Sequence, residues 1–342
     1  MATPLISICL PNLNTRPFLE ERMETILSQT LTDWELIISD NYSDDGAWEF
    51  FQKFRKDPRV HLFQSPRNGM YANWNNCIRS SKGQFVYIAT SDDTMAPDCL
   101  EKMVKALEDH PECDICHCCL TIIDEDGNVS TKRRWENWFA QKFYGELITK
   151  PHIRKAPLDG ILYFSFNTIY SSLTQLLINK KVFDTVGPFK DDWGSAGDFE
   201  WGAKAAMLFN TIHVPEYLAT WREHKNQATP SGDILDFTER KREMIKSSLS
   251  FLEKNNSKFF KRLNIKKLDK IYEKQIFKLR LSRACSTSDK LKLTLSSSII
   301  NPGMIIEKFF DMVFFKNYFY RDLTQMQKEI DKLGLKDNIS IL

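Results

Sequence analysis

The first 110 residues alternate between short apolar runs and amphipathic segments, and this alternation constrains the fold more than any other feature of the chain. Strands are predicted where apolar and β-branched residues cluster, at 5–12, 34–41, 60–66 and 84–93. Helices are predicted where apolar residues recur at helical spacing, at 16–30, 46–56, 70–81 and 96–110. Strand–helix repeats of this length predict an α/β fold, with a parallel sheet covered by helices on both faces.

Polar residues follow each of these predicted strands. They form four clusters, at 11–14, 40–45, 67–68 and 92–93. In open parallel sheets, ligands bind beyond the carboxyl ends of the strands, so the four clusters are expected to meet at one edge. Asp92 and Asp93 repel each other there, which favours a bound cation. The alternative is a polar turn in which Asp93 or Thr94 caps the helix that follows.

The rest of the chain has a less regular pattern. Between 112 and 235 we expect strands at 114–124, 174–183 and 210–223, and from 236 onward the spacing of apolar residues predicts helices. This change divides the chain into an α/β domain at 1–235 and a helical C-terminal region at 236–342. Gly83, which follows the helix predicted at 70–81, suits a left-handed helix cap.

Eight cysteines raise the question of a metal site, because four of them lie in the stretch CDICHCC at 113–119. No second cluster completes a zinc site of the usual kind, and the apolar neighbours favour a buried strand with free thiols. Because no signal peptide precedes MATPLISICLPN, reduced thiols and a cytoplasmic location are expected. No run of about 18 apolar residues occurs, so a simple membrane-spanning helix is not expected.

Charge is distributed unevenly along the chain. Residues 238–342 carry 23 Lys and Arg against 12 Asp and Glu, so residues 1–237 hold a net −9 within the total of +2. Within the basic region, apolar residues at 305–313 fall on one helical face with charged residues opposite. Two interpretations stay open for this helix. It packs on the α/β domain or on a second subunit in a homodimer, or it lies in the plane of an anionic membrane surface.

Four segments carry a resemblance to a known family. They are 7–46, with a Pro–x–x–Asn loop and an aspartate-rich loop; 67–93, with an Asn–Gly helix and the acidic pair; GSAGDFEWGAKA at 194–205; and TWREHKN at 220–226. In this order and spacing they resemble a family 2 glycosyltransferase of the GT-A fold. The resemblance implies a Rossmann-like nucleotide-binding half, a mostly parallel central sheet with helices on both faces, and a helical C-terminal extension. It also implies a nucleotide-sugar donor, Mn²⁺ or Mg²⁺, and transfer with inversion.

The family's metal motif, Asp–x–Asp, falls on Thr90, Ser91 and Asp92, so its first aspartate is missing here. The resemblance makes Asp92 the first choice as a metal ligand, with Asp93 beside it and His224 as a third contact. Ser91 or Thr90 is a weak substitute for the lost carboxylate. A divalent ion held by carboxylates neutralises the charge that develops on a diphosphate leaving group. For His224 the alternative is an ordinary surface histidine.

The resemblance also assigns residues to the nucleotide sugar: Pro11, Asn12, Asn14, Asp40, Arg67, Asn73, Ser91, Asp92 and Arg222. The first three would line the base and ribose, and Asp40 would hydrogen-bond a pyrimidine ring. Arg67 and Arg222 would contact the base or the phosphates, whose oxygens suit a guanidinium fork. Alternatively, Asp40 closes a turn with Asn41, and Arg67 is a solvated surface residue. Asn73 is a poor residue for a helix interior, which predicts a polar partner for it.

Asp198 matches the position of the family's base, which takes a proton from the acceptor hydroxyl as that hydroxyl attacks. Glu200, two residues further on, is the fallback. The alternative for Asp198 is the N-cap of the helix FEWGAKAAMLF, a role that is compatible with catalysis. Gly197 stands where the family usually has a second acid. Four tryptophans offer flat faces for a sugar or pack in the core: Trp135, Trp138, Trp193 and Trp201.

The sequence therefore predicts an inverting, metal-dependent glycosyltransferase. Its donor would be a UDP- or dTDP-sugar, and its acceptor a glycan or lipid-linked oligosaccharide in cell-surface polysaccharide synthesis. We expect a cytoplasmic protein, held at the inner face of the plasma membrane if the basic tail binds lipid. One rival is a catalytically silent nucleotide-sugar-binding or scaffold domain, which the missing aspartate favours. A sugar nucleotidyltransferase is disfavoured because LPNLNTRP, after the first strand, has no glycine. Nucleic acid is not an expected partner, since no motif for it accompanies the lysines.

Overall fold

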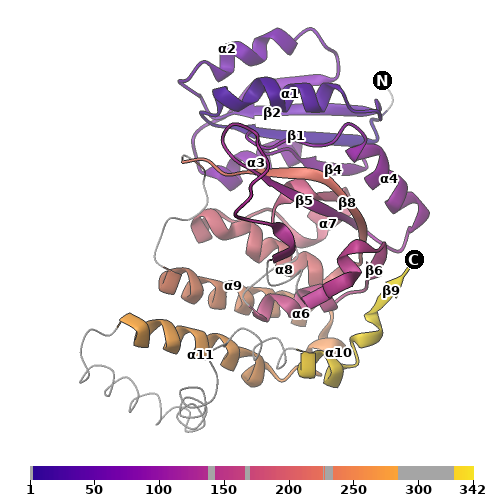
Figure 1. Cartoon of the computed structure of the whole chain (residues 1–342), viewed down its shortest axis with the longest axis vertical. Helices are drawn as coiled ribbons and strands as arrows, with labels where there is room; N and C mark the ends of the chain where they lie inside the picture. The colour runs from indigo at the N-terminus through magenta and orange to yellow at the C-terminus, as the bar shows by residue number, and fades with distance from the viewer. Residues whose placement is uncertain (1–2, 138–142, 166–169, 226, 228–233, 284–326) are drawn as a thin grey trace.

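The computed structural model describes residues 3–137, 143–165, 170–225, 227, 234–283 and 327–342. Over these residues one sheet runs through the molecule in the order β3-β2-β1-β4-β7-β5-β8-β6-β9 (Figure 1). Its strands are β1 Ile6–Asn12, β2 Trp34–Asp40, β3 Val60–Gln64, β4 Phe85–Ile88, β5 Ile115–Ile123, β6 His152–Arg154, β7 Leu176–Asn179, β8 Thr211–Arg222 and β9 Ile339–Ile341.

The first four strands are parallel neighbours, as the alternating pattern predicts. Every residue of β1, β2 and β4 is buried, which is typical of parallel strands covered on both faces. β1 lies between β2 and β4, with Asn12 opposite Asp40 at the carboxyl ends of β1 and β2. This register brings the loops after the strands to one edge of the sheet.

The second half of the sheet is mixed. β7 pairs antiparallel with β4 and β5, whereas β5 and β8 are parallel. The strands predicted at 114–124 and 210–223 are present, but the one predicted at 174–183 ends at Asn179, whose side chain caps a helix. The short strand β9, which no sequence pattern indicated, pairs antiparallel with β6 and joins the end of the C-terminal region to the sheet.

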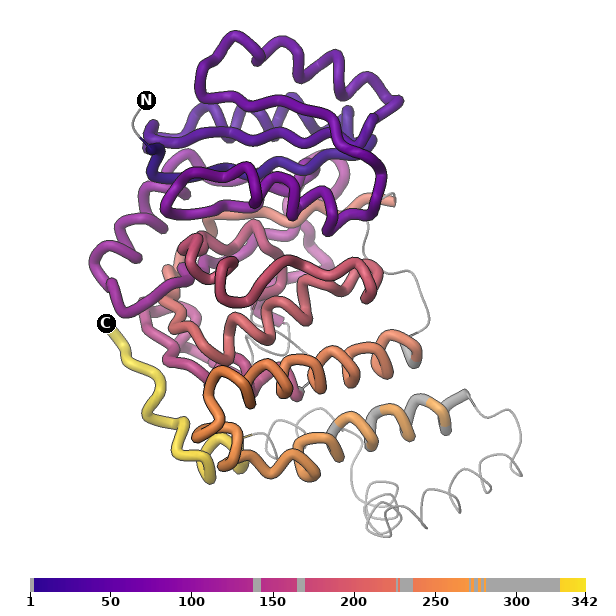
Figure 2. Tube along the Cα trace, turned by 180° about the vertical axis from the view of Figure 1, so that it is seen from behind, coloured from indigo at the N-terminus to yellow at the C-terminus, as the bar shows by residue number. Residues whose placement is uncertain are grey.

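Helices cover the sheet and extend beyond it. They are α1 Leu19–Leu27, α2 Ala47–Phe51, α3 Met70–Ser80, α4 Cys99–Asp109, α6 Leu158–Leu162, α7 Lys180–Val186, α8 Gly197–Leu208, α9 Ile234–Asn255, α10 Ser257–Phe260 and α11 Ile265–Arg283. The 3-10 turn η7, Asp191–Ala196, leads directly into α8. Figure 2 shows α9 and α11 side by side, on the side of α8 away from the first strands. The C-terminal region is therefore packed against the α/β part.

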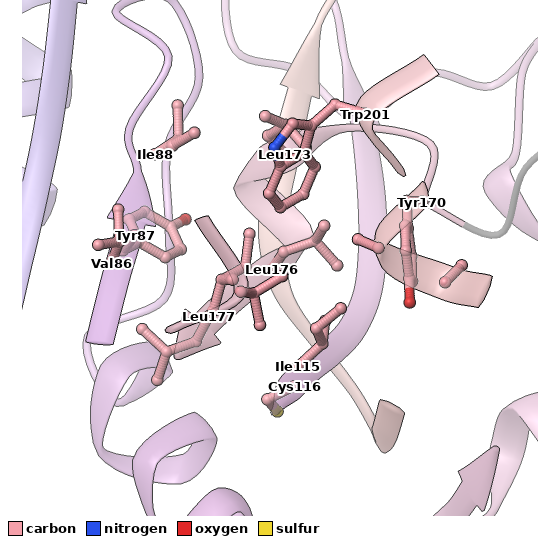
Figure 3. Close-up of a cluster of buried hydrophobic side chains, with 14 of the residues drawn as sticks. Val86, Tyr87, Ile88, Ile115, Cys116, Tyr170, Leu173, Leu176, Leu177 and Trp201 are labelled. Atoms are coloured by element: carbon pink, nitrogen blue, oxygen red, sulfur yellow. The ribbon is translucent and has the colours of Figure 1, made fainter. Parts of the chain in front are cut away.

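One part of the extended core lies where β4, β7 and β5 meet α8 (Figure 3). Leu176 and Leu177 of β7 are fully buried there, next to Ile115 of β5. Trp201 of α8 is also fully buried, so it is a core residue rather than a sugar-stacking one. The cysteines of 113–119 are buried in and beside β5, which confirms the strand interpretation. No group of three or more metal-binding side chains forms among the described residues.

Gly83 has a role that differs from the predicted helix cap. Its backbone does not adopt the left-handed conformation. Instead, a Cβ at this position would lie 2.5 Å from the backbone nitrogen of Ser7, so glycine permits the turn before β4 to press against β1.

The amphipathic segment at 305–313 lies outside the described residues, as does Trp138. Within the described parts of the chain, no helix combines the length and apolar character needed to cross a membrane.

Candidate active site

The four polar clusters do meet at the carboxyl edge of the parallel strands. The backbone N–H of Ser65, after β3, donates to the carbonyl of Asp40 at 2.9 Å, and that of Ala89, after β4, donates to Cys9 of β1 at 2.7 Å. These bonds extend the strand pairing just beyond the ends of β3 and β4, and they hold the beginnings of the following loops together. The candidate site is built on this edge.

Asp40 is an internal anchor of the loop that follows β2. The residue is fully buried, and its Oδ1 accepts hydrogen bonds from Asn12 Nδ2 at 2.8 Å and Ser43 Oγ at 2.6 Å. Its Oδ2 accepts the backbone N–H of Ser43 at 2.9 Å. The turn interpretation is therefore confirmed, with Ser43 rather than Asn41 as the partner. Asn12 is equally buried, and Pro11 lies inside β1 beside it.

The rim of this loop is held by two further predicted residues. The Nδ2 of Asn14 donates to Oδ1 of Asp44 at 2.9 Å, and the backbone N–H of Asp44 donates to Oδ1 of Asn14 at 3.0 Å. Arg67 donates from Nε to the carbonyl of Asn41 at 2.9 Å, and also to the carbonyl of Tyr42. Both residues thus shape the loop. Tyr42 is 54% exposed and its backbone has a positive φ of 52°, so the loop carries an exposed aromatic residue.

Asn73 links the first turns of α3 to the ends of two strands. Its Nδ2 donates to the carbonyl of Asn12 at 3.2 Å and to that of Ser39 at 3.0 Å, while its Oδ1 accepts from Ser65 Oγ at 3.2 Å. The polar partner that the sequence predicted is therefore the protein itself. Asn73 is buried, and its place is behind the site, where it fixes the loops.

Asp92 is the carboxylate of the pair that faces outward. Its side chain is 22% exposed, and its Oδ2 lies 3.0 Å from Nε2 of His224. The imidazole packs on the ring of Phe18 with the ring centroids 4.7 Å apart, which fixes its orientation. His224, 132 positions away along the chain, therefore lies beside the predicted metal ligand Asp92, and its contact with a metal stays a prediction.

Asp93 points the other way, into the protein. It is 2% exposed, and its Oδ1 accepts the backbone N–H of Arg222 at 2.7 Å while Thr90 donates to its Oδ2. Burial, followed by the charge of Asp92, raises the pKa of Asp93 to about 7. Because both oxygens are engaged internally, the structure argues against Asp93 as a metal ligand. Ser91 is buried beside it.

Arg222 braces the site from behind and does not point its charge at a substrate. The residue is 1% exposed. Its Nε donates to the carbonyl of Asp92 at 2.7 Å, its Nη1 to the carbonyl of Glu125 at 3.1 Å, and its Nη2 to the carboxylate of Glu21. The structure therefore argues against the predicted contact with a diphosphate, because most of the guanidinium donors are used to hold the turn that carries Asp92.

A divalent cation fits this edge with Asp92 and His224 as its protein ligands. Their oxygen and nitrogen already lie together, and Asp92 is accessible. No cage of three or more such side chains exists among the residues the structure describes. That is consistent with Mg²⁺, which is usually held by one or two carboxylates together with water and substrate phosphates.

Asp198 lies in the first turn of α8, next to the start of α3. The hydroxyl of Tyr71 donates to its Oδ1 at 3.1 Å, and the backbone N–H of Phe199 donates to the same oxygen at 2.8 Å. Within the described parts of the chain, no such hydrogen bond reaches its Oδ2. Burial raises the pKa of Asp198, and the hydrogen bond from Tyr71 partly opposes that rise. A carboxyl group with a raised pKa is a better proton acceptor than an exposed aspartate.

A lysine completes the surroundings of Asp198. Lys241 of α9 lies with its Nζ 4.5 Å from the centre of the Phe199 ring, and its charge lowers the pKa of Asp198. In turn, burial lowers the pKa of Lys241 to about 8, an effect that the charge of Asp198 opposes. The sequence gave no indication of Lys241, because it lies in a helix 43 positions further along a charged region.

Glu200 is not available as a fallback base. It is 1% exposed and forms an ion pair of 2.5 Å with Lys204, and Ser247 of α9 donates to it at 2.6 Å. Residues two positions apart on an α-helix are rotated by about 200° around its axis, so the side chains of Glu200 and Asp198 face in different directions. The structure therefore assigns Glu200 to packing between α8 and α9.

Asp191 is a site-forming residue that the sequence analysis missed. Its Oδ1 accepts the backbone N–H of Tyr71 at 3.1 Å and that of Ala72 at 3.3 Å, so it caps α3 from a distant segment. Gly69 makes room for it, since a Cβ there would lie 2.6 Å from the same oxygen. The available signal was the acidic pair at 191–192, just before the GSAGD segment. Asp191 thereby ties η7, and with it Asp198, to the strand-end loops.

Comparison with known proteins decides the family. Residues 7–173 match the family described as Glycosyl transferase family 2. The chain is also 31% identical over 222 residues to Uncharacterized protein MT1568 of Mycobacterium tuberculosis, a match that covers 65% of this chain and 68% of that protein. The chain belongs to glycosyltransferase family 2. It is further similar to chondroitin synthase of Escherichia coli, at 26% identity over 189 residues, 55% of this chain and 27% of that protein.

Solved structures show that the family 2 domain has the GT-A fold. TarS 1–349 of S. aureus, crystallised with UDP-GlcNAc, superposes with a TM-score of 0.55 at 13% identity, covering 80% of this chain and 81% of that one. This likeness shows the fold alone. The chain spans about half the length or less of several curated relatives, such as 46% of a Methanocaldococcus jannaschii glycosyltransferase and 23% of a Sinorhizobium fredii protein.

Proposed function

We propose that this family 2 glycosyltransferase transfers a sugar from a nucleotide-diphosphate donor to a hydroxyl group of a glycan or lipid-linked acceptor, with inversion at the anomeric carbon. The observation that carries the proposal is the position of Asp198. Its carboxylate has a raised pKa, an Oδ2 to which none of the described residues donates a side-chain hydrogen bond, and a link through Tyr71 and Asp191 to the edge where the strands end. A base in that position can meet an acceptor bound beside the donor.

The donor would occupy the loops after β1 and β2. Asn12, Asp40 and Asn73 fix these loops from behind, so they act as positioning residues. Tyr42 offers a face on which the base of a UDP- or dTDP-sugar would stack. Asn14 and Arg67 would complete the rim of that pocket.

The diphosphate would lie at Asp92 and His224. Mn²⁺ or Mg²⁺ bound there would act as a Lewis acid and neutralise the charge on the leaving group. Asp92 supplies an accessible carboxylate, and Arg222 holds the turn that presents it. Of the two adjacent aspartates only Asp92 would bind the ion, because the carboxylate oxygens of Asp93 are hydrogen-bonded inside the protein.

In the transfer step, the acceptor hydroxyl attacks the anomeric carbon from the side opposite the diphosphate, and Asp198 takes its proton. A bond from the acceptor oxygen to the anomeric carbon forms while the bond from that carbon to the diphosphate oxygen breaks. Tyr71 holds the carboxylate in place throughout. The name of the chondroitin synthase relative supports a polysaccharide as the acceptor, and cell-surface polysaccharide synthesis as the setting.

The test is a screen of nucleotide sugars for donor hydrolysis and transfer, with and without Mn²⁺, using wild-type protein and Asp198→Asn. The variant keeps the shape of the side chain and the hydrogen bond from Tyr71. We expect its turnover to fall about a hundred- to ten-thousand-fold, with donor binding retained. Asp184→Asn, which changes an exposed carboxylate on α7, is the matched control and should turn over like the wild type. Equal turnover in wild type and Asp198→Asn would show that the base assignment is wrong.

A silent nucleotide-sugar-binding domain is the second candidate, because only one of the two carboxylates after β4 faces outward. The same screen separates the two. If the wild type binds UDP or dTDP but turns over none of the donors, the silent domain is the better description.

A further inference from the structure

A cavity of about 390 Å³ lies between η7, α9 and α11, and the proposed chemistry does not use it. This volume is in the range of roughly 300–1,000 Å³ that small-molecule sites occupy. Trp193 of η7 lines one side, Arg240 and Arg242 of α9 line another, and Arg280 of α11 lines a third. Glu239 and Glu243 of α9 and Ile276 of α11 also line it, so the wall consists of three arginines, two glutamates, an indole ring and an isoleucine.

The three arginines differ in how their charges are balanced. Arg242 donates to Asp269 at 2.7 Å, and Arg280 pairs with Glu239. Arg240 makes no ion pair with any carboxylate in the part of the chain that the structure describes, and its Nε is buried without a hydrogen-bond acceptor. Its guanidinium carbon lies 6.0 Å from the centre of the Phe237 ring.

Trp193 presents a second unused donor at the same cavity. Its indole Nε1 is buried and has no acceptor. A buried donor left unpaired costs about 1–3 kcal/mol, more for a charged group, so such groups are usually paired with protein, water or a ligand. Two of them, on residues that line one cavity, indicate that an acceptor-rich group binds there.

The cavity is adjacent to the proposed base. Trp193 and Asp198 belong to one continuous segment, in which η7 runs into α8. Arg240 precedes Lys241, the lysine beside Asp198, on α9. Gly194 allows the two walls to approach, since a Cβ on it would lie 3.4 Å from Nη1 of Arg240 at a φ of +59°. The cavity therefore shares η7 and α9 with the surroundings of the proposed base.

We propose that this cavity binds an oxyanion, a phosphate or a carboxylate, carried by the acceptor. Arg240 would bind the oxyanion through its guanidinium fork, and Trp193 would donate a hydrogen bond from Nε1. The acceptor of this enzyme would then be an acidic glycan or a sugar phosphate rather than a neutral sugar. This inference rests on the proposed function, because it names the substrate class of the same site.

The test uses the full chain with its tryptophans labelled with ¹⁵N, in the presence of UDP and Mg²⁺ to occupy the donor pocket. Glucose 1-phosphate, glucuronic acid and glucose are titrated, and the indole N–H signal of Trp193 is identified from its loss in Trp193→Phe. We expect one or both of the anionic sugars to shift that signal and glucose to leave it in place. Which anion is effective distinguishes phosphate from carboxylate.

Arg240→Gln should weaken the effective anion about tenfold or more, because a hydrogen bond to a charged group is lost. Arg55→Gln, which removes an exposed arginine near α2, should not weaken the binding of that anion. The inference is overturned if neither anion shifts the Trp193 signal, if glucose shifts it equally, or if Arg240→Gln binds like the wild type. Donor hydrolysis is measured in parallel on the same protein preparations, with the nucleotide sugars of the screen in place of UDP. Hydrolysis without anion binding contradicts this inference alone, and anion binding without hydrolysis contradicts the proposed function alone.

Discussion

At Asp198, burial and a neighbouring cation act on the same carboxyl group in opposite directions. Burial raises its pKa, whereas the hydrogen bond from Tyr71 and the charge of Lys241 lower it. The net effect is a pKa of Asp198 above that of an exposed aspartate, which makes the carboxylate more basic. Lys241 is therefore expected to act as a positioning residue that sets the pH range of the base.

Lys241→Met tests this at the scale of one residue. Without the ammonium group, the pKa of Asp198 rises further, so the deprotonated base is populated only at higher pH. We expect the rising limb of kcat against pH to move to higher pH, with the plateau rate little changed. Lys246→Met, on the exposed side of the same helix, is the control. An acid limb that stays at the wild-type pH in Lys241→Met would contradict the account.

The element that positions the base is α8, and its first turn serves two purposes. Asp198 faces α3 and the strand-end loops, whereas Glu200 faces Lys204 and Ser247. The second set of contacts holds α9 against α8, and α9 in turn carries Lys241 and Arg240. The ion pair is therefore expected to support the fold of the C-terminal helices and not the proton transfer.

Glu200→Gln separates these roles. The substitution leaves the ammonium of Lys204, a residue only 7% exposed, without its carboxylate partner. We expect the free energy of unfolding to fall by about 3 kcal/mol, measured by urea titration, because a partly buried charge loses its partner. Glu49→Gln, on the exposed face of α2, should change it by less than about 0.5 kcal/mol. If Glu200→Gln instead abolishes turnover at full stability, Glu200 is the base.

Sequence patterns predicted the elements where the periodicity is local. The strands up to β4 and the helices between them follow from buried apolar runs and amphipathic spacing, and β5 and β8 follow from the same signal. They failed where a helix cap or a tertiary contact decides. The run at 174–183 reads as one strand, but Asn179 caps α7 and ends the strand there. β9 forms only because β6 offers a free edge.

At the site, the sequence identified the correct segments but not the direction of each side chain. Asp92 and Asp93 are adjacent, and only the backbone N–H of Arg222, 129 positions away from Asp93, decides which of them turns inward. The same holds for Arg222 itself, whose partners lie in three separate loops. Residue type and spacing cannot reveal such contacts, because they depend on how distant loops pack.

For the whole molecule, a buried histidine network in the second half of the sheet predicts how stability depends on pH. His152 and His213 are fully buried, and Nη1 of Arg154 lies 3.0 Å from Nε2 of His152, which requires a neutral ring. Burial, and then the charge of Arg154, lowers the pKa of His152 to about 4 and also lowers that of His213. The unfolded chain therefore binds more protons than the folded one below its own histidine pKa of 6.5.

Stability should accordingly fall as the pH drops from about 6.5 toward 4. Between pH 7 and pH 5, His152 alone should remove about 2 kcal/mol from the free energy of unfolding. Urea titrations at the two pH values measure this loss, and His152→Gln should reduce it. A variant with the same pH dependence as the wild type would show that His152 is not responsible.

The central claim is that the parallel strand ends bind a nucleotide diphosphate through a divalent ion at Asp92. The most direct measurement is calorimetric titration of UDP into wild-type protein and Asp92→Asn, each with and without Mn²⁺. The account predicts that Mn²⁺ tightens UDP binding to the wild type about tenfold or more, and that Asp92→Asn loses this gain. Binding of UDP that is equally tight in all four titrations, or absent from all four, would contradict it.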